Sequence, residues 1–105
     1  MAGFGESNKS NQKKISYLDQ KYDESEILTK AIKYHYEGNI VKASKIYQFL
    51  IEKGSKNFNI FKNYSLILIS VGKYKDAEFF VRKAIDLNPK DAISHYNLGG
   101  ILQNQ

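Results

Sequence analysis

The sequence contains no cysteine and no tryptophan, and it has one proline and one methionine in 105 residues. Without cysteine there is no disulfide, no thiolate metal site and no cysteine nucleophile. The single proline, Pro89, ends any helix that reaches it, because proline lacks a backbone donor and restricts the residue before it, Asn88.

Long apolar runs are also missing. The longest aliphatic run is Leu66 to Ile69, which is far too short to span a membrane. The first fourteen residues are polar and contain no secretory apolar region, and Ala2 in place of glycine excludes the myristoylation motif. We therefore expect a cytoplasmic location.

The charge is moderately basic and dispersed. Sixteen basic residues, mostly lysine, and eleven acidic residues give a net charge of +5. A nucleic-acid footprint is normally concentrated on one face or one helix. Here lysines alternate with acidic residues, as at Lys73, Lys75 and Asp76, which is typical of solvated helix faces. The pattern argues against a nucleic-acid partner.

The sequence repeats itself at an offset of thirty-four residues. The aligned pairs are Ile27 and Phe61, Gly38 and Gly72, Ile40 and Tyr74, Ala43 and Ala77, and Tyr47 and Val81. A third, incomplete copy aligns Lys30, Tyr64 and Leu98, and next to them Ala31, Ser65 and Gly99. This period is typical of stacked helical repeats, in which one unit cannot bury its apolar face alone.

Apolar spacing of three and four residues predicts five helices and no strand. The helical stretches begin near Glu24, Ile40, Phe58, Tyr74 and Ala92, with breaks at 37–39, Gly54, 72–73 and 88–89. Asp91 is a natural N-cap for the last of them. We expect a flexible polar arm over 1–22 and an all-α repeat domain over 23–105. Its units are 24–57, 58–91 and the first helix of an incomplete third repeat, 92–105.

The second copy resembles a tetratricopeptide (TPR) repeat. The residues that carry the resemblance are Phe61, Tyr64, Ser65, Leu68, Gly72, Tyr74, Ala77, Val81, Ala84 and Pro89. The first copy keeps Ala31, Tyr34, Gly38, Ala43 and Tyr47, but departs at Leu50, where the family favours alanine, and at Ser55, where it favours proline. The resemblance implies about two and a half repeats in a right-handed superhelical stack of antiparallel helix pairs.

The resemblance also implies which side chains face a ligand, because the first helix of each pair lines a concave groove in this family. The positions carried over are Thr29, Ile32, Tyr36, Lys62, Asn63, Leu66, Tyr96 and Asn97. One column, Thr29, Asn63 and Asn97, resembles the asparagine ladder of the O-linked N-acetylglucosamine transferase arrays, which binds peptide backbone. The alternative is that Asn63 and Asn97 are merely solvated polar residues.

Two other interpretations of this surface are weaker. Lys62 beside Asn63 is similar to part of the carboxylate clamp of chaperone-binding TPR domains, but the matching places in the other copies include Leu28 and Gly100, so most of the clamp is absent. Aromatic residues could form a platform for single-stranded nucleic acid. Most of them fall in core columns, however, and we expect Tyr36 and Tyr96 alone to face the groove.

Catalytic motifs are missing as well. His35 and His95 lie sixty residues apart with no nucleophile or carboxylate at motif spacing, and no glycine-rich, Walker or HExxH motif occurs. We expect His35 at the groove edge and His95 in packing. The sequence therefore predicts no enzyme, no cofactor and no metal.

The leading hypothesis is a non-catalytic module that binds an extended peptide or partner protein in the groove. The alternative is the N-terminal substrate-docking array, or a remnant of one, of a larger bacterial glycosyl-, sulfo- or methyltransferase. A further partner is a second copy of the chain, stacked through the uncapped last helix at Gly99 to Leu102.

Overall fold

The computed structural model describes residues 22–105, and these form five helices and no strand. The helices are α2 (Glu24–Tyr36), α3 (Ile40–Glu52), α4 (Phe58–Ser70), α5 (Tyr74–Leu87) and α6 (Ala92–Asn104). The predicted all-α stack of five helices is confirmed. The polar arm expected over 1–22 lies, except for Tyr22, outside the described residues.

Polar residues begin most of the helices. The Asp23 carboxylate accepts hydrogen bonds from the backbone N–H groups of Ser25 and Glu26, at 3.1 and 3.3 Å. The same role falls to Asn39, Asn57 and Asp91 in α3, α4 and α6. Such caps satisfy backbone donors that have no partner within the helix.

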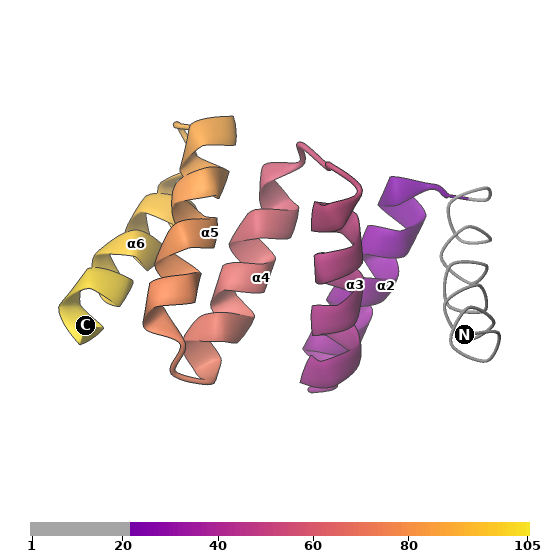
Figure 1. Cartoon of the computed structure of the whole chain (residues 1–105), viewed down its shortest axis with the longest axis horizontal. Helices are drawn as coiled ribbons and strands as arrows, with labels where there is room; N and C mark the ends of the chain where they lie inside the picture. The colour runs from indigo at the N-terminus through magenta and orange to yellow at the C-terminus, as the bar shows by residue number, and fades with distance from the viewer. Residues whose placement is uncertain (1–21) are drawn as a thin grey trace, which may run out of the picture.

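Glycine ends the first helix of each complete pair. Gly38 after α2 and Gly72 after α4 have φ of +83° and +79°, a left-handed conformation that side chains with a Cβ rarely adopt. The following residues bond back to the helix, with Asn39 N–H donating to the Tyr34 carbonyl at 2.8 Å. These tight turns reverse the chain, so consecutive helices run in opposite directions (Figure 1).

Small residues allow the helices to approach closely. Ala31, Ala43, Ser65, Ala77 and Ala84 are all fully buried. Larger apolar side chains fill the space between the helices, and the fully buried ones include Tyr47, Leu50, Ile60 and Val81. Contacts run along the row from α2 to α6, and α4 also contacts α6 directly. The chain thus advances in one direction, from α2 at one end to α6 at the other (Figure 1).

Tyr22 joins the end of this row. Its ring packs edge-on against Phe49 of α3 at a centroid distance of 5.9 Å, and its hydroxyl donates to the Glu24 carboxylate at 3.1 Å. Tyr22 thus contacts the start of α2 and packs on α3. Within residues 22–105, no helix has the length and apolar character needed to cross a bilayer.

Candidate functional site

Two adjacent hollows lie between the first helices of the three repeats, which are α2, α4 and α6. One, of about 340 Å³, lies between α2 and α4, with Tyr47 of α3 at its base. The other, of about 440 Å³, lies between α4 and α6. Leu66 of α4 lines both, so the two hollows adjoin across this side chain. We call the two hollows together, with Leu66 between them, the groove.

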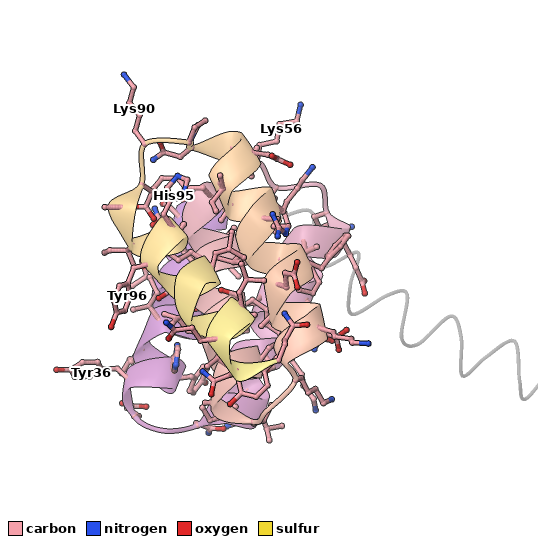
Figure 2. The ribbon with its side chains drawn as sticks, turned by 90° about the vertical axis from the view of Figure 1, so that its left-hand side faces the viewer. Tyr36, Lys56, Lys90, His95 and Tyr96 are labelled. Atoms are coloured by element: carbon pink, nitrogen blue, oxygen red, sulfur yellow. The ribbon has the colours of Figure 1, made fainter. Side chains whose placement is uncertain are left out.

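Six of the eight residues predicted for a ligand surface line this groove. Ile32, Tyr36 and Asn63 line the α2/α4 hollow, Tyr96 and Asn97 line the α4/α6 hollow, and Leu66 lines both. Tyr36 and Tyr96 are 93% and 81% exposed. They extend from the same side of the molecule, although one belongs to α2 and the other to α6 (Figure 2).

Thr29 lies outside both hollows. Its side chain is exposed, and its hydroxyl donates to the Ser25 carbonyl one turn back in α2, at 2.8 Å. Threonine side chains within helices often donate to the carbonyl one turn earlier. Of the predicted column Thr29, Asn63 and Asn97, the groove is therefore lined by Asn63 and Asn97 only.

Lys62 also lies outside both hollows. Its Nζ is 3.5 Å from Asp91 Oδ2 and lies over the Phe58 ring, 5.1 Å from the centroid. Hydrogen bonds from Ser94, with a smaller contribution from Lys62, hold the pKa of Asp91 below its ordinary value. Because Lys62 is engaged by a carboxylate at the start of α6, it is not a free cation for an acidic peptide.

Several groove residues were missed from the sequence: Gly99, Ile101 and Asn104 line the α4/α6 hollow, and Tyr47 lines the α2/α4 hollow. Tyr47 is the one that belongs to a second helix. Its column is a core column, and the ring is indeed fully buried, tilted against Tyr64 at 6.5 Å. The hydroxyl, however, forms no hydrogen bond of good geometry within residues 22–105, although the Asn63 side chain is near enough to act on it as a weak donor. Burial raises the pKa of Tyr47, and the nearby Asn63 amide opposes part of this shift. The signal in the sequence was the hydroxyl itself, because a buried tyrosine normally needs a partner for it.

A second groove residue, Asn97, also has a buried polar atom without a hydrogen bond. Asn97 Nδ2 is buried and forms no hydrogen bond in the structure. The groove as a whole is nearly free of charge. The α4/α6 hollow has no Lys, Arg, Asp, Glu or His in its lining, and His35 is the one such residue in the lining of the α2/α4 hollow. The groove therefore offers apolar surface, amides and hydroxyl groups.

The packing role expected for His95 is wrong. His95 is exposed near the start of α6, and its Nε2 lies 2.7 Å from the Pro89 carbonyl oxygen. The preceding loop thus offers a carbonyl that the ring can reach without entering the core. His35 lines the α2/α4 hollow, as expected. Within residues 22–105, no three His, Cys, Asp or Glu residues gather in a way that could hold a metal ion.

Most aromatic residues of the repeat columns are in the interior. Tyr47, Phe61 and Tyr64 are buried, and Tyr34 and Tyr74 are half-buried. Phe79, which the sequence pattern does not single out, is 68% exposed on α5 and borders a separate hollow of about 560 Å³ that includes Ile51 of α3. An aromatic stacking track along the groove would thus have Tyr36 and Tyr96 as its exposed members.

The face of α6 proposed for stacking with a second copy is only partly exposed. Ile101 is 1% exposed and belongs to the core of this chain, whereas Leu102 is 49% exposed. The end of the helix is also tied back to α5, since Gln105 Nε2 donates to Glu78 Oε1 at 2.7 Å. A partner stacked on α6 would meet Leu102 and not Ile101.

No protein-family model matches the chain, and no curated protein matches it significantly.

Proposed function

We propose that the chain is a cytoplasmic member of the TPR family and a non-catalytic module that binds an extended segment of a partner protein in the groove. The observation that supports this most is that Leu66 lines both hollows, which therefore adjoin. Three first helices contribute to one surface, and a segment laid along it would contact all three. Apolar side chains with a few well-placed polar groups are the usual lining of a binding site.

The chemistry of the lining supports binding in preference to catalysis. Asn63 and Asn97 offer amide donors and acceptors, which suit a peptide backbone. His35 is the one imidazole in the lining, and no carboxylate, lysine or arginine lines the groove beside it. A surface this small should bind weakly unless a second contact adds avidity.

A selection experiment tests the proposal even while the partner is unidentified. The full chain is used to select binders from a phage-displayed library of random decapeptides. Each enriched peptide is then tested on Leu66→Lys, which introduces a charge between the hollows, and on Phe79→Lys, which makes the same change outside the groove. We expect peptides that fail on the Leu66 variant and still bind the Phe79 variant. A library with no such peptide would contradict the proposal.

The amides provide a quantitative second test. We expect the double variant Asn63→Ala, Asn97→Ala to weaken an enriched peptide by about 2–4 kcal/mol, taking about 1–2 kcal/mol for each buried hydrogen-bonding group. Asn59→Ala is the matched control, because Asn59 lies on the same helix as Asn63 but lines neither hollow. Isothermal titration calorimetry measures the three affinities. Equal losses in the double variant and the control would show that the amides do not contact the peptide.

A further inference from the structure

Each half of the groove is lined by a residue with a buried polar atom that forms no hydrogen bond of good geometry within residues 22–105. Tyr47, whose Oη is one such atom and has Asn63 as a weak donor nearby, is 0% exposed and lines the α2/α4 hollow, and Asn97, whose Nδ2 is the other, lines the α4/α6 hollow. Buried polar groups in folded proteins are nearly always paired, so each exception needs an explanation. Two exceptions in adjoining halves of one surface have a common explanation if a ligand completes both.

The chemistry of the two atoms defines what the ligand must supply. An amide nitrogen has two N–H donors and accepts nothing, so Asn97 Nδ2 requires an acceptor. A neutral tyrosine hydroxyl can donate its proton in the same way. Peptide carbonyl oxygens are acceptors that recur along an extended chain, and one segment crossing Leu66 can present a carbonyl to each hollow.

The surroundings of the groove indicate that the segment carries no charge. Neither hollow is lined by a lysine, arginine, aspartate or glutamate, and the nearby Lys62 is held by Asp91 at 3.5 Å. A charged side chain placed here would lose its hydration without gaining a counter-charge, which is unfavourable. Ile32, Leu66 and Ile69 instead offer contact surface to apolar side chains.

We infer that the ligand is a neutral, apolar peptide segment whose backbone carbonyls accept hydrogen bonds from Tyr47 Oη and Asn97 Nδ2, with Leu66 between the two contacts. This inference rests on the proposed function and specifies the class of peptide. It assigns Tyr47, a residue of a second helix, to a ligand surface otherwise built from first helices.

The decapeptides that depend on Leu66 test the class of ligand by their composition. The inference expects apolar residues to be enriched and Asp, Glu, Lys and Arg to be depleted relative to the library. Enrichment of acidic or basic residues would overturn the inference and leave binding in the groove intact. If no decapeptide depends on Leu66, the proposed function fails, and the inference fails with it.

A second experiment tests the two contacts by calorimetry with one synthetic neutral decapeptide from that selection. Tyr47→Phe and Asn97→Leu should each weaken binding by about 5- to 30-fold, the range of one buried hydrogen-bonding group. Tyr64→Phe is the matched control, because that hydroxyl already has a partner, accepting from Gln48 Nε2 at 2.9 Å. Unchanged affinity in Tyr47→Phe or Asn97→Leu would overturn the inference.

Ester substitution in the peptide distinguishes a direct contact from a general disturbance of the groove. Replacing one backbone amide by an ester weakens the carbonyl as an acceptor. If Tyr47 donates to that carbonyl, the ester lowers affinity for the wild-type chain and has no effect on Tyr47→Phe. The inference requires one such position for Tyr47 and another for Asn97. A scan in which every ester has the same effect on wild type and variants would refute both contacts.

Discussion

Replacing Tyr47 by phenylalanine should stabilise the chain when no ligand is present. The ring is fully buried and its hydroxyl forms no hydrogen bond of good geometry with the described residues, so the weak contact with Asn63 leaves most of the cost of a dehydrated polar group in the native state. That cost is about 1–3 kcal/mol. Phenylalanine keeps the ring and its contact with Tyr64 and leaves only a small void. We expect the free energy of unfolding to rise by about 1 kcal/mol.

The matched control is Tyr64→Phe. That hydroxyl accepts a hydrogen bond from Gln48 at 2.9 Å, so its removal loses an existing interaction and should lower stability by about 0.5–1.5 kcal/mol. Urea denaturation followed by circular dichroism at 222 nm measures both variants, with equal m-values as the condition for comparison. In a domain of this size 1 kcal/mol shifts the melting temperature by about 4–8 °C.

The same pair of proteins gives a pH dependence with a definite sign. Burial raises the pKa of Tyr47 above its ordinary value of 10.0, with partial opposition from Asn63. Above pH 10.0 the unfolded chain releases this proton while the folded chain retains it, so wild-type stability falls until the folded-state pKa is reached. The stability difference between Tyr47→Phe and wild type should therefore widen above pH 10.0. A Phe variant less stable than wild type at neutral pH would refute the reasoning, because it would show that the hydroxyl is already satisfied.

Four further substitutions test the fold. Gly72→Ala should lower the free energy of unfolding by about 1–2 kcal/mol, because φ at this position is +79°. Gly99 lies within α6, and there is open space where its Cβ would be, so Gly99→Ala should raise the free energy of unfolding by about 0.5–1 kcal/mol. The urea midpoints of the two variants, compared with that of wild type, test both predictions. Asp91→Ala should lower the melting temperature, because it removes the hydrogen bonds that Ser94 donates to the carboxylate. The pKa of Asp91 is lowered in the folded chain, so its contribution to stability is lost on protonation, and the difference from wild type should shrink as pH falls below 3.8. Thermal scans across pH 2–7 measure this difference, and a constant difference would contradict the prediction. Ala77→Leu should cost about 1–3 kcal/mol because Ala77 is 0% exposed between helices, and an unfolding free energy equal to wild type would show that the interface can expand.

Local spacing in the sequence carries most of the information about the fold. Gly38 and Gly72, thirty-four residues apart, both adopt positive φ, and Ala43 and Ala77 are both fully buried. The turn and the apolar face depend on residues within a few positions of one another, so periodicity is sufficient to predict them. The expected end of the third helix, α4, before Gly72 and the N-cap at Asp91 follow from the same local rules.

Contacts between distant side chains account for what the sequence did not reveal. The ion pair of Lys62 with Asp91 joins α4 to the start of α6, and no local pattern links the two residues. The ring of His95 reaches the Pro89 carbonyl only because the loop before α6 turns toward it. Periodicity assigns a side chain to a face of its helix, whereas its partner atom depends on how neighbouring helices are placed.

The repeat itself provides the strongest reason to regard the Tyr47 hydroxyl as functional. Val81 lies thirty-four residues later, in the equivalent column, and it is also fully buried. A side chain without any polar atom therefore satisfies the packing of this column, so packing does not require the hydroxyl at Tyr47. In the first repeat Tyr47 lines a hollow, and its buried hydroxyl lacks a hydrogen bond of good geometry within residues 22–105, which is costly for the free chain. A polar atom that packing does not need and folding does not favour is best explained by what enters the groove.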